Sequence, residues 1–258
     1  MYKVTARNFS DSHENRMHSD DVAKRYGFSG ALVPGVAVYG HLSYPLVEHY
    51  GVKWLESGHD SLRLLKPAYH EDELTLQLQN THGLVQSSAL NTEGVLLATA
   101  TELAPEQSLN PYDSPHAIQD APIKAAGRSE ISWENVVPGE RLKPWVLDTS
   151  TQANTQFTQQ ISDNNPLYKT YIHPHLIAGA ANSVLTAEYT MPAWIHVGTQ
   201  TLRHKAIHVD DEISVDSIVT KTWQRKGHSF LEVYIQLQRD NLLTTEMLHT
   251  AIFEVAEQ

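Results

Sequence analysis

The sequence predicts an α+β fold in which one unit, a long helix packed against antiparallel strands, occurs twice. Three observations predict this fold. Residues of the same type recur at a nearly constant spacing across the two halves of the 258-residue chain. Each half contains an apolar run of helical length, and each run is followed by segments in which apolar and polar residues alternate. We therefore expect each copy to wrap a sheet around its own central helix.

The repeat is carried by residue types that are uncommon or structurally demanding. At a spacing of 140, the aligned pairs are Pro34 with Pro174, Trp54 with Trp194 and Gly58 with Gly198, and at 139 Lys66 aligns with Lys205. Upstream the spacing is 150, and there the pairs are Asn15 with Asn165 and His18 with Tyr168. The change from 150 to 140 predicts that the second copy lacks about ten residues between Tyr168 and His173.

The boundary between the copies is predicted in residues 105–127. This stretch is polar, and its four prolines, Pro105, Pro111, Pro115 and Pro122, are typical of a linker rather than of a helix or a hairpin. We therefore expect an N-terminal unit of residues 1–104, a linker of residues 105–127 and a C-terminal unit of residues 128–258.

The helices are predicted from apolar runs and end signals. Residues 20–27 begin with two aspartates and end at Gly27, which is typical of a short capped helix. Residues 36–50 form a mostly apolar run long enough for a buried helix. Its counterpart, residues 176–185, is small and apolar, so we expect it to be packed closely.

The strands are predicted from alternation. Apolar residues lie on one face only in residues 74–79 and 231–238, which is typical of a half-buried strand. Residues 95–100 and 248–253 alternate less strictly and are expected to be more fully buried. Gly94 and the pair 240–241, Asp-Asn, supply turns.

Composition excludes several classes of function. With 19 Lys and Arg against 30 Asp and Glu, the net charge of −11 opposes a nucleic-acid partner, which would need a basic stripe. The chain has no cysteine, which excludes disulfides, cysteine-ligated zinc and a thiol nucleophile. No apolar leader and no stretch of 18 apolar residues is present, so we expect a cytoplasmic protein with no membrane partner.

Three short segments before or at the start of the long helices carry a resemblance to a known family. Residues 162–168 read Ser-Asp-Asn-Asn-Pro-Leu-Tyr, residues 15–18 read Asn-Arg-Met-His, and residues 33–35 read Val-Pro-Gly. The arrangement resembles that of the MaoC-like dehydratases, whose motif Asp-x-Asn-Pro-x-His is followed by a glycine-bearing turn that opens the central helix. The resemblance covers most of both halves, and it implies a double hotdog fold in one chain.

The resemblance also implies an activity: hydration of 2-enoyl thioesters or dehydration of 3-hydroxyacyl thioesters, with an acyl-CoA or an acyl-carrier-protein thioester as the partner. In this chemistry water loses a proton as it attacks the β-carbon, and the α-carbon gains one, so positioned acid/base groups are required. Negative charge develops on the thioester oxygen and is best met by a backbone N–H at a helix N-terminus.

In the first copy the resemblance implies His18 as the acid/base group, Asn15 as the residue that orients it or the water, and Gly35 as the oxyanion donor. The place of the motif's aspartate is taken by His13, with Asp11 two residues earlier, and either could supply a second acid/base group.

In the second copy the motif is broken at a different position. Asp163 and Asn165 match it and are candidate catalytic residues of the same chamber or of a second one. Tyr168 replaces the histidine and would be a hydrogen-bond donor, since a phenol of pKa about 10 is a poor base at neutral pH. His175 replaces the glycine.

Further candidates lie nearer the C-terminus. Arg225, Lys226 and His228 form a basic turn that is either a solvated hairpin loop or a docking point for the phosphates of CoA or a carrier pantetheine. His196, in a segment with strand alternation, is a further candidate site residue. His173 and His175 have no third ligand at a helical or hairpin spacing, so no metal is expected. The chain has no glycine-rich phosphate loop, and no cofactor is expected.

Alternatives to a hydro-lyase remain open because both copies depart from the motif. One is another thioester reaction on the same scaffold, either hydrolysis or conjugate addition of an amine. Another is a non-catalytic subunit that binds acyl thioesters or pairs with an active chain, since one scaffold hosts many chemistries. Association into a homodimer is also left open.

Overall fold

The computed structural model describes residues 1–10, 14–81, 83–124 and 127–256. The first copy contains β1 (Tyr2–Thr5), η1 (Arg16–His18), α1 (Asp20–Arg25), α2 (Gly35–Tyr50), α3 (Val52–Ser57), β2 (His59–Leu64), β3 (Glu73–Thr81), β4 (Leu84–Leu90) and β5 (Leu96–Glu102). The linker region holds α4 (Ala117–Asp120). The second copy contains β6 (Ser129–Glu130), β7 (Trp145–Leu147), α5 (Thr151–Gln160), η2 (Pro166–Lys169), α6 (Pro174–Glu188), β8 (Tyr189–Thr190), β9 (Ile195–Arg203), β10 (Ile213–Arg225), β11 (His228–Arg239) and β12 (Leu242–Glu254).

The two halves form one continuous antiparallel sheet of ten strands, with the order β1-β3-β4-β5-β2-β9-β12-β11-β10-β7. The order reads the same from both ends once β2 is matched with β9, β5 with β12, β4 with β11, β3 with β10 and β1 with β7. At the centre Ser61 pairs with Gln200, so residues 139 apart face each other across the join. This arrangement confirms the predicted α+β fold and the internal duplication, because such self-pairing is what a pseudo-twofold axis requires.

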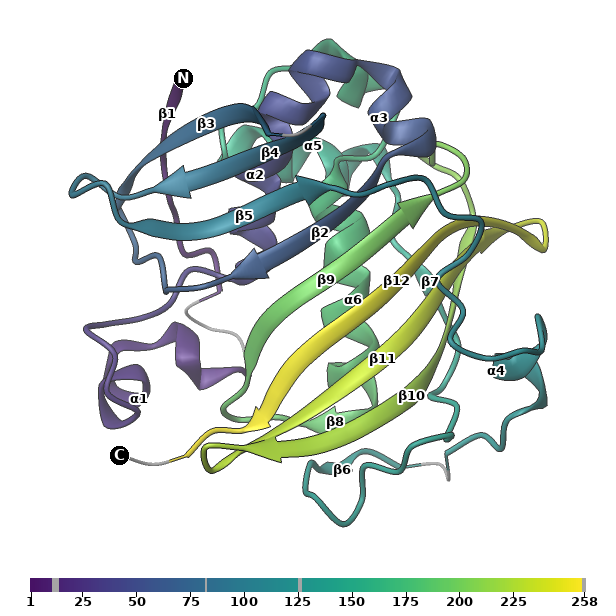
Figure 1. Ribbon diagram of the computed structural model, residues 1–258. Coiled ribbons are helices and arrows are strands. Elements are labelled where there is room, and N and C mark those ends of the chain that lie inside the picture. The colour runs from purple at the N-terminus through teal and green to yellow at the C-terminus, as the bar shows by residue number, and fades with distance from the viewer. Residues whose placement is uncertain (11–13, 82, 125–126, 257–258) are drawn as a thin grey trace.

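The sheet wraps around the two central helices, α2 and α6, which lie against one face of it (Figure 1). Most side chains of α2 are buried, as its apolar sequence predicts, and α6 packs closely through small residues such as Ala178, Ala180 and Ala181. Gly40 is needed on α2 because a Cβ there would lie 2.9 Å from the ring of Phe157 on α5. The central helices of the two copies are therefore packed against one another as well as against the sheet.

The two copies differ where the change in spacing predicts it. In the first copy α1 lies between η1 and the central helix, whereas in the second only four residues separate η2 from α6. The aligned tryptophans are both buried but lie in unlike local structure, Trp54 within α3 and Trp194 just before β9.

The linker region crosses the outer face of the second half's sheet. Leu109 and Ile118 pack there against a small apolar cluster on the strands. Ser108 donates a 2.6 Å hydrogen bond to the buried Glu246, which also receives hydrogen bonds from Tyr234 and His204. Burial alone would raise the pKa of Glu246, but these three donors lower it, so a charged carboxylate holds the linker to the sheet.

None of the helices in the described ranges is both long and apolar enough to cross a bilayer.

Candidate functional site

The three candidates of the first copy lie together in one pocket of about 250 Å³, here called the first chamber. Asn15 and His18 flank η1, and Gly35 is the first residue of α2. Most of the remaining lining is apolar, and it includes residues from α6, β9 and β12 of the other copy. A mostly apolar pocket with a few convergent polar groups is typical of a small-molecule site.

His18 is held in one tautomer at the wall of this chamber. Its Nδ1 lies 2.7 Å from the carbonyl oxygen of Leu32, and because a carbonyl can only accept, Nδ1 carries the hydrogen. Nε2 is therefore the unprotonated nitrogen of the neutral ring, 3.4 Å from the side-chain nitrogen of Asn15. The backbone thus fixes the tautomer that a general base needs.

Asn15 has a structural role as well as its contact with His18. Its Oδ1 accepts a hydrogen bond from the N–H of Met17 and so caps η1, while its Nδ2 donates to the carbonyl of Trp194 at 3.0 Å. Because Trp194 belongs to the second copy, Asn15 ties η1 to the other half and holds His18 over the pocket.

Gly35 supplies a backbone donor where no side chain could fit. It opens a helix of 16 residues, and in the described part of the chain no group accepts its N–H. A Cβ on Gly35 would lie 2.3 Å from Cδ1 of Leu64 and 3.0 Å from Nδ1 of His196. The close approach of these two side chains therefore requires glycine at position 35. The N-terminus of α2 also favours a negatively charged ligand atom beside Gly35.

Other polar residues of the first chamber come from distant parts of the chain. His196 of β9, Asn182 of α6 and Lys66 line it. Asn182 and Lys66 carry no local sequence signal, since their place depends on how the second copy and the loop after β2 pack. An adjoining pocket of about 210 Å³ shares His18 and Asn182 with the first chamber and extends between the central helices. The lining of the adjoining pocket is mixed, with polar residues such as Gln160 and Ser183 beside Val36 and Ala37.

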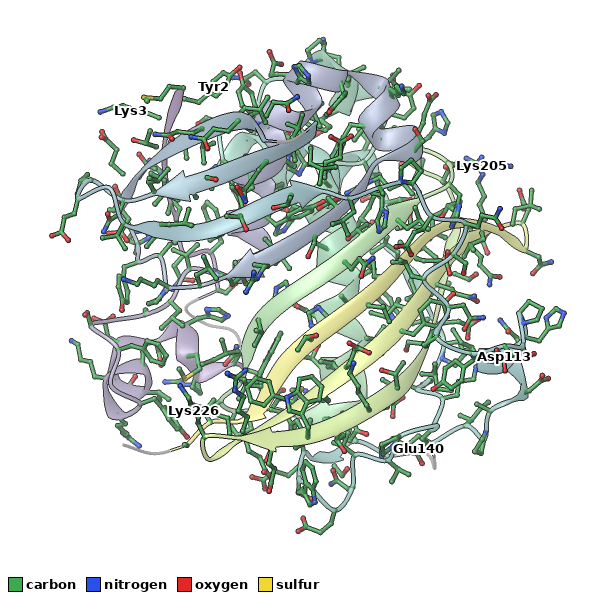
Figure 2. The ribbon with its side chains drawn as sticks, viewed as in Figure 1. Tyr2, Lys3, Asp113, Glu140, Lys205 and Lys226 are labelled. Carbon is green, nitrogen blue, oxygen red and sulfur yellow. The ribbon has the colours of Figure 1, made fainter. Side chains whose placement is uncertain are left out.

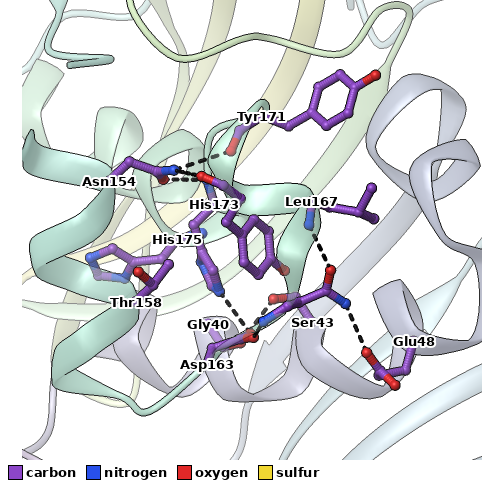
Figure 3. Close-up of polar contacts among 12 residues, drawn as sticks. Gly40, Ser43, Glu48, Asn154, Thr158, Asp163, Leu167, Tyr171, His173 and His175 are labelled. Carbon is purple, nitrogen blue, oxygen red and sulfur yellow. Dashed lines mark hydrogen bonds and ion pairs between the residues drawn. The ribbon is translucent and has the colours of Figure 1, made fainter. Parts of the chain in front are cut away.

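The candidates Asp163 and Asn165 lie at a different pocket, of about 380 Å³, here called the second chamber. Asn165 caps η2 by accepting from the N–H of Leu167, as Asn15 caps η1, and it also donates to Glu48 at 2.8 Å (Figure 3). Asp163 faces the buried ring of His173, with 3.3 Å between Oδ2 and Nε2. Nδ1 of His173 accepts from the N–H of His175, so Nε2 carries the hydrogen that is donated to Asp163.

Tyr168 is buried beside the second chamber and does not line it, whereas His175 lines the pocket that adjoins the first chamber. Burial raises the pKa of Tyr168 well above its usual value, so the phenol keeps its proton. His175 stacks on Phe157 with 3.5 Å between ring centroids and donates from Nδ1 to the carbonyl of Val36. The position equivalent to Gly35 is thus closed by an imidazole, and the structure brings Asn15, His18 and Gly35 together but holds Asp163 and Asn165 apart from them.

Buried histidines around the second chamber make stability depend on pH. Burial lowers the pKa of His41 to about 4, that of His175 to about 3 and that of His173 below its usual value, the last partly offset by Asp163. Because the unfolded chain binds these protons near pH 6.5, the free energy of unfolding should be highest above that pH. It should fall as the pH drops from 6.5 toward 4, by about 1 kcal/mol per pH unit for each group.

Urea unfolding midpoints measured between pH 7.5 and 4 test this expectation. His41→Leu removes one titrating group and should make the fall less steep. A stability that does not change between pH 6.5 and pH 4.5 would contradict the assignment of neutral, buried rings.

The basic turn lies at the tip of the β10–β11 hairpin (Figure 2). Lys226 and Gly227 adopt positive φ angles of 52° and 78°, which gives a tight two-residue turn. His228 accepts from the N–H of Ala256 at 3.0 Å. None of Arg225, Lys226 and His228 lines the pockets described above. His13 and Asp11 lie outside the described residues. Among the described residues, no group of three or more His, Asp or Glu side chains could hold a metal ion.

Comparisons with known proteins identify the fold. No established family profile and no curated protein sequence matches the chain. Among solved structures, a MaoC-like dehydratase matches with a TM-score of 0.58 and 12% identity over 96% of both chains. A conserved hypothetical protein from Mycobacterium tuberculosis, described as having a double hotdog fold, matches with a TM-score of 0.60 and 11% identity over 97% of this chain and 93% of that one. The chain has a double hotdog fold.

A third match broadens the comparison. A putative oleoyl thioesterase from Lactobacillus plantarum matches with a TM-score of 0.55 and 9% identity, over 99% of this chain and 97% of that one. Structures with different reaction names thus share this architecture, and the choice of chemistry depends on the residues of the site.

Proposed function

We propose that this double hotdog protein hydrates 2-enoyl thioesters, or dehydrates 3-hydroxyacyl thioesters, in the first chamber. The observation that carries the proposal is that His18, whose tautomer is fixed by the carbonyl of Leu32, and Gly35, the first residue of α2, line one mostly apolar pocket. The similarity to a MaoC-like dehydratase and to the dehydratase domain of a curacin polyketide synthase, with a TM-score of 0.51, supports this reaction class.

In the hydration direction His18 can handle the proton. Nε2 accepts a proton from water as the water oxygen bonds to the β-carbon, and the π electrons of the double bond move toward the thioester carbonyl. The N–H of Gly35 stabilises the resulting enolate oxygen. The His18 imidazolium then returns the proton to the α-carbon, so one water is added in total and the ring is restored. Asn15, 3.4 Å from Nε2, keeps the ring in place.

The substrate class follows from the shape of the site. The mostly apolar first chamber would take the acyl chain, and the carrier, CoA or an acyl-carrier protein, would remain outside. Arg225 and Lys226 are exposed and positively charged in an acidic protein, so they would bind the carrier's phosphates, with His228 at the base of the turn. Asp163, Asn165 and Tyr168 would then hold the second, non-reacting chamber in shape.

Incubation with crotonyl-CoA and with longer 2-enoyl-CoAs tests the proposal. We expect the ultraviolet absorbance of the enoyl thioester to fall as water adds across the double bond, with no release of free thiol. Release of free CoA would instead indicate thioester hydrolysis, the reaction named for the putative oleoyl thioesterase. Binding of the thioester without any turnover would contradict the proposal and favour a binding subunit.

A further inference from the structure

A second imidazole, that of His196, lies in the first chamber beside the start of α2. Only 6% of the residue is exposed, and its Nδ1 lies 3.0 Å from the place that a Cβ on Gly35 would occupy. In the part of the chain that the structure describes, Nδ1 has no hydrogen-bond partner. Leaving a buried polar nitrogen unpaired costs free energy. Because Nδ1 of His196 lies at the wall of the pocket, an atom of a bound ligand could be its hydrogen-bond partner.

The other nitrogen of His196 is held by a chain of hydrogen bonds inside the sheet. Nε2 lies 2.8 Å from Oγ1 of Thr199, and the same oxygen lies 2.9 Å from Nδ1 of His249. A hydroxyl donates one hydrogen and can accept two hydrogen bonds, so Thr199 can donate to Nε2 of His196 while it accepts from Nδ1 of His249. The two possible directions of this chain decide whether Nδ1 of His196 presents a hydrogen or a lone pair to the chamber.

With a ligand acceptor at Nδ1 of His196, one direction of this chain leaves only a lone pair unpaired. If Thr199 donates to His196, the hydrogen of His196 is on Nδ1, and His249 keeps an unused lone pair on Nε2, which has no partner among the described residues. In the reverse direction His249 would bury an unused N–H. Orphaned buried N–H groups are rarer than under-used acceptors, so a ligand acceptor at Nδ1 of His196 would satisfy the chain.

Both rings are neutral at physiological pH. Burial lowers the pKa of His196 to about 4 and that of His249 well below its usual value. A ring that binds protons so weakly is a poor general base at neutral pH, which leaves that role to His18. A neutral imidazole can still donate a hydrogen bond to an oxygen whose charge increases during the reaction.

We propose that His196 donates a hydrogen bond from Nδ1 to the carbonyl oxygen of a bound thioester, beside the N–H of Gly35. This inference rests on the proposed function and deepens it, because it makes His196 a substrate-binding group of the same chamber. The nearness of Nδ1 to Gly35 lets both donors reach one oxygen. The bond strengthens as negative charge moves onto that oxygen, so His196 contributes to binding and more strongly to turnover.

A pair of ligands that differ only at the carbonyl tests this role without turnover. Octanoyl-CoA is saturated and cannot be hydrated, and S-octyl-CoA is the thioether that lacks the carbonyl oxygen. By calorimetry, His196→Ala should weaken binding of octanoyl-CoA about tenfold and leave binding of S-octyl-CoA nearly unchanged. His196→Gln retains an N–H donor and should recover part of the loss for octanoyl-CoA.

Two further variants separate recognition from structure. Thr199→Val keeps the His196 ring but removes the hydroxyl that sets its hydrogen, so it should cause a smaller loss for octanoyl-CoA alone. His59→Ala is the matched control, because His59 is also a buried imidazole on the sheet but bonds to Gln200 and to the carbonyl of Ala104, away from the chamber. It should not change the ratio of the two affinities.

The outcomes distinguish the inference from the proposed function. Equal weakening of both ligands by His196→Ala, or no weakening of either, would overturn the role of His196 while leaving a thioester site in place. If the wild-type protein bound neither CoA ligand, the proposed function would fail and the inference with it.

Discussion

Replacing Asp60 with alanine should lower the free energy of unfolding by about 3–5 kcal/mol. Asp60 lies on β2 and Arg203 on β9, the two strands that join the halves, and both side chains are completely buried. Arg203 donates to Asp60 at 2.7 Å and to the hydroxyl of Tyr39 at 2.6 Å. Without the carboxylate, the guanidinium would be an uncompensated charge inside the protein, which is the large cost in this variant.

Urea unfolding of single and double variants checks this expectation. Glu73→Ala is the matched control, because its ion pair with Lys3 is largely exposed and should contribute less than about 1 kcal/mol. Adding Arg203→Met to Asp60→Ala should recover part of the lost stability, since it removes the unpaired charge. A loss for Asp60→Ala no larger than that for Glu73→Ala would show that the pair does not hold the two halves together.

The sequence predicts the elements whose side chains repeat along the chain. The apolar runs of residues 36–50 and 176–185 lie within α2 and α6, and the alternating segment 231–238 lies within β11. In contrast, α5 gives no such signal, because its sequence is mostly polar and only Asn154 and Phe157 are buried. Its position depends on tertiary contacts, such as the stacking of Phe157 on His175, that no local pattern contains.

Only the site residues that lie in the repeated segments can be predicted from the sequence. Aligning Asn15 with Asn165 predicts equivalent positions before the central helices, and in the structure each of the two side chains caps a short 3-10 helix. The difference between the chambers depends on side-chain volume, because Gly35 leaves space at the start of α2 and the imidazole of His175 occupies the equivalent place on α6. His196 lines the first chamber because β9 of one copy pairs with β2 of the other. The residue pattern of a single strand cannot predict this pairing.

His18→Ala should reduce turnover of a 2-enoyl-CoA by about 100- to 10,000-fold, the usual contribution of a positioned acid/base group. The loss should appear in kcat, because His18 moves a proton in the transition state and need not hold the ground-state thioester. Affinity for octanoyl-CoA should therefore change little. Steady-state kinetics and calorimetry on the same preparation measure both quantities. His116→Ala, which removes an exposed imidazole at the start of α4, is the control for a histidine outside the pockets.

The same assay decides between the two chambers when Asp163→Asn is measured beside His18→Ala. In the first chamber a base and a helix N-terminus line one pocket, whereas in the second Asp163 is already bonded to His173 and no glycine opens the helix. We therefore expect Asp163→Asn to cost stability, through the broken pair with His173, and much less turnover than His18→Ala. If folded Asp163→Asn protein lost as much activity as His18→Ala, or if His18→Ala kept the wild-type rate, the reacting thioester would have to lie in the second chamber. The physical basis of the choice is that hydration needs a basic side chain and a backbone N–H within reach of one substrate, and His18 and Gly35 line one pocket.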